Sequence, residues 1–126
     1  MPVRSRETMH PEYRYRATVA SVYDGDTFRA DVDLGFSVWT KNVSFRMFGI
    51  DTPEIRGGTA ATKAAGIAAR DRLRELMPVG ASILIDSTKA GKYGRYLADV
   101  FLDLEDGPLH VNQVLLDEGH AVPYLP

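Results

Sequence analysis

The feature that most restricts the fold of this chain is one change in hydrophobic periodicity near its middle. Before about residue 50, apolar and polar side chains alternate as in half-buried strands; Phe28, Ala30 and Val32, for example, share one face. After Gly57-Gly58 the apolar residues recur at helical spacing instead. At 126 residues the chain is long enough to bury a core of its own. We therefore expect one domain that combines strands and helices.

Turn and cap residues divide this pattern into five strands and two helices. Asp24-Gly25 is a strong tight-turn signal. Thr59 is a suitable N-cap for the first helix, which Pro78 and Gly80 end. This order of elements favours an α+β, mainly β fold: a five-stranded Greek-key barrel of the oligonucleotide-binding (OB-fold) type with two helices. The expected strands are 13–23, 27–34, 38–48, 81–85 and 96–102, and the expected helices are 60–77 and 111–118.

The first helix has two distinct stripes. Its core-facing residues at helical spacing are expected to be Ala65, Ala69, Leu73 and Leu76. Lys63, Arg70 and Arg74 form a basic stripe on another side. This stripe is either a track for a nucleic-acid backbone or an ordinary solvated helix face, and the interleaved acids favour the second interpretation.

Composition narrows the chemistry that is open to the chain. There is no cysteine, which excludes disulfides and thiolate metal sites. The three histidines lie far apart without ligand-like spacing, so any metal should be a hard cation bound by oxygen atoms. The net charge of −2 argues against a nucleic-acid coat protein but is compatible with an enzyme that binds a few phosphates locally.

The sequence also gives expectations about organisation and compartment. No apolar run approaches the length needed to span a membrane, and the first residues are polar and charged. We therefore expect a cytoplasmic protein with a flexible N-terminal arm at 1–12 and a single domain at 13–126.

Three short motifs carry the chemistry. Their carboxylates can hold one hard cation and leave one acid as a base, and their two arginines have forked donors that suit phosphate. This combination is the equipment for hydrolysing a phosphodiester. The motifs are Asp24-Gly25-Asp26-Thr27, Arg46 through Glu54, and Lys92-Tyr93-Gly94-Arg95.

Some of these residues also have a simpler explanation. Turn chemistry explains Asp24 about as well as a site does, whereas Asp26 is not needed for the turn. Arg46 would lie on the order of 16 Å before Asp51 along an extended strand. A shared site therefore requires this strand to be strongly curved.

Taken together, the motifs resemble those of the staphylococcal (micrococcal) nuclease family, the thermonuclease-like domain. The resemblance runs from about Tyr13 to Tyr124, with the motifs in the same order and at comparable spacings. It implies a five-stranded barrel and a calcium-dependent endonuclease. It also implies that nucleic acid, DNA or RNA, is the substrate and that cleavage leaves 3′-phosphate ends.

The resemblance further implies roles for individual residues. Glu54 would be the base that activates water, and Arg46 and Arg95 would bind the phosphate as it gains charge. The implied ligands of Ca²⁺ are the carboxylates of Asp26 and Asp51 and the backbone carbonyl of Thr52, with Asp24 close by but not in direct contact; the implied substrate-binding residues are Lys92, Tyr93 and Tyr124.

Two alternatives remain open from the sequence. One is a non-catalytic nucleic-acid-binding module on the same barrel, which is expected where such domains have lost their acids; here the acids and arginines are all present. The other is a protein-interaction domain. The family resembled here continues into a third helix, so a protein partner or a homodimer could cover the corresponding surface of this chain.

Overall fold

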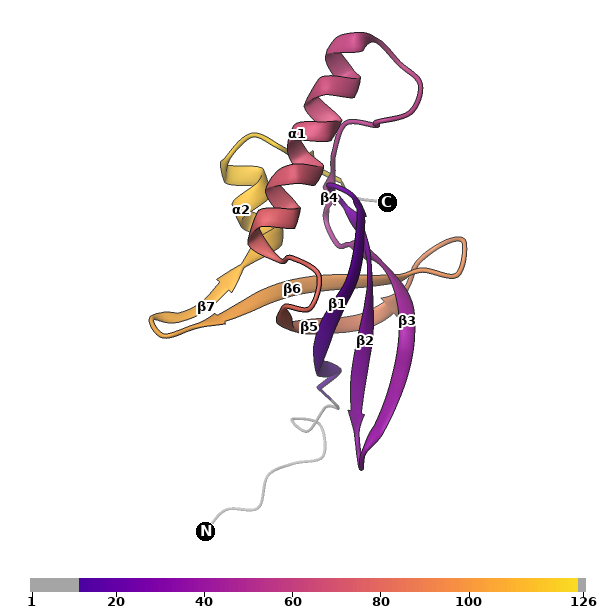
Figure 1. Cartoon of the computed structure of the whole chain (residues 1–126), viewed down its shortest axis with the longest axis vertical. Coiled ribbons are helices and arrows are strands. Elements are labelled where there is room, and N and C mark those ends of the chain that lie inside the picture. The colour runs from indigo at the N-terminus through magenta and orange to yellow at the C-terminus, as the bar shows by residue number, and fades with distance from the viewer. Residues whose placement is uncertain (1–11, 125–126) are drawn as a thin grey trace, which may run out of the picture.

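Five strands close into a barrel because the strand at one end of the main sheet also pairs with the fifth strand of its order. The computed structural model describes residues 12–124, except for the side chains of residues 88 and 89. Its sheet has the order β3-β2-β1-β5-β6-β7, where β7 is the short strand Gly107–His110. An additional parallel pairing of β3 with β6 closes the ring (Figure 1). The barrel strands are β1 (Arg14–Asp24), β2 (Thr27–Gly35), β3 (Val38–Met47), β5 (Ser82–Ala90) and β6 (Tyr96–Leu104).

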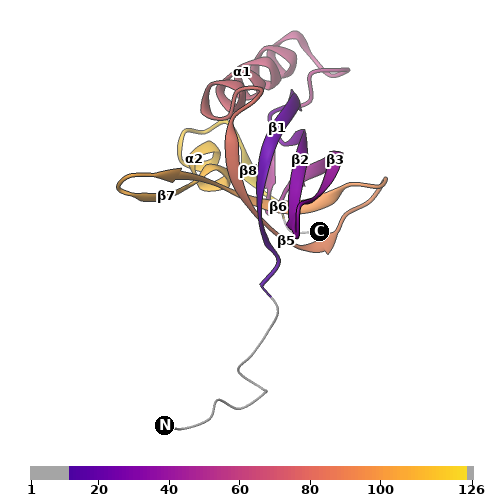
Figure 2. The same ribbon diagram turned by 60° about the horizontal axis from the view of Figure 1, so that its bottom comes forward.

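Two helices cover the barrel on one side (Figure 2), and the core lies between them and the strands. They are α1 (Ala60–Leu76) and α2 (Val111–Asp117). The predicted barrel with two helices is therefore confirmed. The N-cap prediction is also confirmed, because the Thr59 side chain accepts a hydrogen bond from the Thr62 backbone N–H. The predicted arm at 1–12 lies outside the described residues apart from Glu12.

The predicted core face of α1 is partly wrong. Ala65 is exposed, whereas Gly66 is buried together with Ala69 and Leu73, and the half-buried Leu76 packs against the core as expected. The helix is turned toward Gly66 because a residue without a side chain permits close contact with the loop that precedes the helix. The basic stripe is also divided: Arg74 donates to the Val22 carbonyl instead of facing solvent freely.

The sequence did not predict three short strands or the second half of β5. They are β4 (Ile50–Asp51), β7 (Gly107–His110) and β8 (Val122–Pro123), and β5 continues to Ala90 instead of ending at 85. The register of β5 against β6 shifts between residues 86 and 89. Such an irregularity interrupts the alternation of side chains, so this part of β5 looks like a loop in the sequence.

A buried asparagine ties α2 to the barrel beneath the closing seam. Asn112 is 2% exposed, and its side-chain oxygen accepts from the Val100 backbone N–H at 2.9 Å. Its amide nitrogen donates to the carbonyls of Phe48 and Ala98 at 2.9 and 3.1 Å. One side chain therefore connects a helix, strand β6 and the turn after β3.

Neither described helix is long and apolar enough to cross a membrane.

Asn112→Ala should strongly destabilise the fold, because it leaves buried backbone groups without the partner that this side chain supplies. We expect a loss of about 3 kcal/mol in the free energy of unfolding, measured by chemical denaturation. Gln113→Ala is the control: its side chain is exposed and bonds only to Asp117 among the described residues. A change within about 0.5 kcal/mol for both variants would contradict a structural role for Asn112.

Candidate active site

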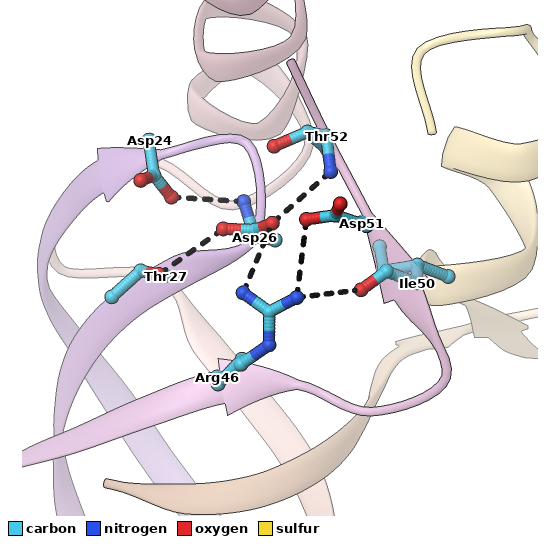
Figure 3. Close-up of polar contacts among 7 residues, drawn as sticks. All are labelled: Asp24, Asp26, Thr27, Arg46, Ile50, Asp51 and Thr52. Carbon is cyan, nitrogen blue, oxygen red and sulfur yellow. Dashed lines mark hydrogen bonds and ion pairs between the residues drawn. The ribbon is translucent and has the colours of Figure 1, made fainter. Parts of the chain in front are cut away.

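Arg46 connects the two acidic segments that the sequence singled out (Figure 3). Its Nη1 atom lies 3.2 Å from Oδ2 of Asp26, and its Nη2 atom lies 3.2 Å from Oδ1 of Asp51. Nη2 also donates to the Ile50 carbonyl at 3.2 Å. The two carboxylates therefore converge on one guanidinium group.

The barrel places Arg46 beside both other motifs. It pairs with Thr27 of β2 on one side and with Leu97 of β6 on the other. Thr27 directly follows Asp26, and Leu97 lies two residues after Arg95. The parallel β3–β6 pairing that closes the barrel thus also assembles the site.

The long distance expected between Arg46 and Asp51 is removed by a turn. Strand β3 ends at Met47, and the chain turns at Phe48-Gly49, where Gly49 has a φ of 78°. The strongly curved strand that we expected is therefore wrong, and glycine is suited to this left-handed conformation. Beyond the turn, Asp51 returns to face Arg46.

Asp26 is the most buried acid of the cluster, at 5% exposure. Its Oδ2 atom accepts from the Thr52 backbone N–H at 3.1 Å, and its Oδ1 atom accepts from the Thr27 hydroxyl at 3.2 Å. Asp24 lies beside it and accepts from the Asp26 backbone N–H at 3.1 Å. Burial, and then the neighbouring Asp24, raise the pKa of Asp26 above its ordinary value, although Thr52 and Arg46 oppose the shift. An ionised Asp26 is thus a strong attractor of positive charge.

The pKa of Arg46 is raised as well, for a different reason. Burial alone would lower the pKa of Arg46, but the charges of Asp26 and Asp51 raise it overall. The guanidinium therefore stays charged, as arginine does in proteins generally. Its three contacts with described residues use at most three of its five N–H donors.

The C-terminal strand fixes Asp51 and brings an aromatic ring to Arg46. Strand β8 pairs with β4, so that Asp51 lies opposite Val122. The Tyr124 backbone N–H then donates to the Gly49 carbonyl at 2.9 Å. The Cζ atom of Arg46 lies 5.2 Å from the centre of the Tyr124 ring, which is a cation–π arrangement.

A cleft of about 540 Å³ opens beside this cluster. Arg46 and Asp51 line it together with most of the third motif. Arg95 is half-buried and lies over the ring of Tyr93, which is 89% exposed. Four of the residues expected to bind substrate or phosphate line this cleft: Lys92, Tyr93, Arg95 and Tyr124.

Glu54 lies in a different place. It shares a second hollow of about 340 Å³ with Asp24, and Arg46 and Asp51 do not line this hollow. The structure therefore brings together Asp24, Asp26, Arg46, Asp51 and Thr52, places the third motif in the adjoining cleft, and places the expected base in the hollow beside Asp24.

Comparison with known proteins identifies the family of this chain. The family model described as "Staphylococcal nuclease homologue" matches residues 44–125, which is about two thirds of the chain. The chain belongs to this family. The match includes Arg46, Asp51, Glu54 and Arg95, whereas the Asp24–Asp26 turn precedes it.

A relative in the archaeon Methanocaldococcus jannaschii, described as an uncharacterized protein, is 29% identical over 130 residues. The alignment covers 88% of this chain and 60% of the relative, so this chain spans about three fifths of that protein's length.

In this nuclease-homologue domain, the donor set around Arg46 fits a hard cation. No group of three or more acidic or histidine side chains among the described residues is arranged to hold a metal by itself. Two carboxylates nevertheless converge on one positive charge. Mg²⁺ is often bound by one or two carboxylates with water and substrate phosphate, and Ca²⁺ also accepts backbone carbonyls. The site therefore suits an ion that completes its coordination with such groups.

Gly66, which the sequence did not single out, positions the backbone of the expected base. A Cβ atom at Gly66 of α1 would lie 2.6 Å from the Pro53 carbonyl oxygen and 3.1 Å from the Glu54 carbonyl carbon. The helix therefore packs directly on the backbone that carries Glu54. The signal in the sequence is the glycine itself, since glycine inside a helix costs about 1 kcal/mol relative to alanine and needs a packing reason.

Gly66→Ala should destabilise the domain, even though alanine is the better helix former. The new methyl group meets backbone atoms that cannot move cheaply, so we expect a net loss of about 1–3 kcal/mol in the free energy of unfolding. Ala68→Gly, at an exposed position of the same helix, should cost about 1 kcal/mol from helix propensity alone. A Gly66→Ala variant that is more stable than the wild type would show that the close contact does not constrain the helix.

Proposed function

We propose that this protein is a calcium-dependent endonuclease that hydrolyses phosphodiester bonds of DNA, RNA or both. The observation that carries the proposal is the position of Arg46, which joins Asp26 and Asp51 at the edge of a cleft that Arg95 also lines. Membership of the staphylococcal nuclease homologue family supports the same reaction class.

The two arginines bind the scissile phosphate in this proposal. Both line the cleft, and their forked donors match phosphate oxygens in pairs. Charge accumulates on these oxygens as water attacks, so fixed guanidinium groups stabilise the transition state more than the bound substrate. The exposed ring of Tyr93 and the ring of Tyr124 offer surfaces for the adjoining nucleoside, and Lys92 adds a positive charge.

The cation would be held by the carboxylates of Asp26 and Asp51 and by the carbonyl of Thr52. Asp24 would lie next to Asp26 without contacting the cation. When bound, Ca²⁺ supplies positive charge for the phosphoryl oxygen and the attacking water. Asp26 and Asp51 already hold a positive group in the form of Arg46. The hydrogen bonds of Arg46 to these acids and to Ile50 leave other N–H donors of its guanidinium group for the phosphate.

Glu54 acts as the base. It is exposed in the hollow on the side of Asp24 and accepts the proton of the attacking water. The bond between phosphorus and the 5′ oxygen breaks on the opposite side, the 5′ oxygen takes up a proton, and the phosphate stays on the 3′ end. This polarity follows from the family resemblance.

Digestion of plasmid and single-stranded DNA tests the reaction. We expect cleavage with Ca²⁺ that a chelator abolishes, and a decrease of about 100-fold or more in kcat/KM for Glu54→Gln and for Arg46→Ala, because each removes a group that acts in the transition state. Glu105→Gln and Arg29→Ala are matched controls at exposed positions outside the site and should retain activity.

Each possible failure has a separate meaning. Undiminished cleavage in chelator would overturn the metal requirement, and full activity of Glu54→Gln would remove Glu54 from its role. Tight oligonucleotide binding without cleavage under any cation would favour the non-catalytic binding module instead.

Ca²⁺ should also stabilise the folded protein, because it binds the assembled carboxylates and not the unfolded chain. At a Ca²⁺ concentration 100 times the Kd, the free energy of unfolding should rise by about 2.7 kcal/mol. Asp26→Asn should lose this increment, whereas Asp103→Asn, at an exposed position on β6, should keep it. Chemical denaturation with and without Ca²⁺ measures the difference, and an equal increment in both variants would place the ion elsewhere.

A further inference from the structure

The hollow that contains Glu54 has features that the proposed reaction does not use. The residues that line it are Tyr23, Asp24, Glu54, Ile55, Arg56 and Arg70; we refer to it as the Tyr23 hollow. Its volume of about 340 Å³ lies within the range of small-molecule sites. It combines an aromatic ring, two guanidinium groups and the expected catalytic base.

Tyr23 is directed outward by an irregularity of its strand. In the pairing of β1 with β2, Val22 lies opposite Phe28 and Asp24 lies opposite Thr27, so Tyr23 is the additional residue of a bulge. Bulges next to active sites often redirect a side chain. Tyr23 is 59% exposed, so its ring is accessible to a ligand in the hollow.

The neighbourhood of Tyr23 is fixed by α1. Arg74 of this helix donates to the Val22 carbonyl at 3.0 Å. One turn earlier, Arg70 lines the hollow, and its Nε and Nη2 atoms donate to Asp71 at 3.1 Å. One turn earlier again, Gly66 packs on the Glu54 backbone. The same helix face therefore positions the base, one cation and the strand end that carries the ring.

The Tyr23 hollow and the cleft adjoin different residues of the Arg46 cluster. They share no lining residue among those described, yet both adjoin the buried Asp26: Asp24 of the hollow accepts from its backbone N–H, and Arg46 of the cleft contacts its carboxylate. A nucleic-acid strand whose phosphate contacts Arg46 therefore has two separate hollows beside it for its nucleosides.

We propose that the Tyr23 hollow binds the nucleoside on the 3′-linked side of the scissile phosphate, with its base stacked on Tyr23 and the next phosphate near Arg56 and Arg70. This inference rests on the proposed nuclease function. Water approaches from the side of Glu54, so the departing 5′-linked nucleoside leaves on the opposite side, into the cleft. The 3′ oxygen of the retained nucleoside lies across the line of attack, so this nucleoside extends past Asp26 to the hollow in this proposal.

The charges of the hollow are compatible with this use. Among the lining residues, Arg56 and Arg70 match Asp24 and Glu54 in number, and Arg70 is also paired with Asp71 on the same helix. Arg56 is therefore the main cation that the hollow offers to a phosphate. Stacking of a base on an aromatic side chain contributes about 1–3 kcal/mol without sequence preference. Tyr23 is therefore expected to act through substrate affinity and not through the chemical step.

Three small phosphodiesters test separately the nucleoside sites on the two sides of the scissile phosphate. They are the dinucleotide TpT, thymidine 3′-(methyl phosphate), which offers only the retained nucleoside, and thymidine 5′-(methyl phosphate), which offers only the departing one. For Tyr23→Ala with Ca²⁺ we expect KM to rise about tenfold for the first two substrates, with kcat nearly unchanged and the third substrate unaffected.

Matched variants separate stacking from loss of structure. Tyr23→Phe should behave as the wild type, because the flat ring is retained, whereas Tyr23→Leu should resemble Tyr23→Ala although it keeps apolar bulk. Tyr13→Ala changes another exposed tyrosine near the start of β1 and should leave all three substrates unaffected.

The outcomes distinguish this inference from the proposed function. If the wild type cleaves TpT but Tyr23→Ala changes no KM, or changes all three equally, the nuclease stands and the subsite is wrong. If Tyr23→Ala affects only the 5′-linked substrate, the assignment of sides is wrong. If the wild type cleaves neither these three substrates nor longer DNA, the proposed function is wrong, and the proposed subsite is wrong with it.

Discussion

The site depends on the contact of one guanidinium group with two carboxylates that come from different parts of the barrel. Arg46 lies where β3 pairs with both β2 and β6, which is the seam that closes the barrel. Asp26 is supplied by the turn before β2, and Asp51 by the short strand after β3. If the barrel did not close at this seam, the acids, Arg46 and the loop carrying Arg95 would have no common location.

The same arrangement explains why a buried acid is tolerated. A buried carboxylate is costly unless it is paired and hydrogen-bonded. Asp26 has Arg46 as its charge partner and the Thr52 N–H and Thr27 hydroxyl as donors. Burial, and then the neighbouring Asp24, nevertheless raise the pKa of Asp26 above its ordinary value. Perturbed carboxylates of this kind cluster at functional sites.

Helix α1 positions a second part of the site, separate from the seam. In successive turns, Gly66 packs on the Glu54 loop, Arg70 lines the Tyr23 hollow, and Arg74 contacts the end of β1. The basic stripe that the sequence suggested is therefore not a uniform track for a nucleic-acid backbone. One arginine holds a strand carbonyl, and another faces the hollow.

The sequence by itself determined the five barrel strands in outline, the two helices and the identities of the acids and arginines, because alternation, turn residues and charged motifs are local properties. It could not reveal that Gly49 turns the chain back toward Arg46, that β8 pairs with β4, or that Gly66 and not Ala65 faces the loop. These features depend on contacts between residues far apart in the chain. Only the closed barrel decided that Asp26 and Asp51 meet at Arg46 while Glu54 lies beside Asp24, because that separation is set by strand register and helix packing.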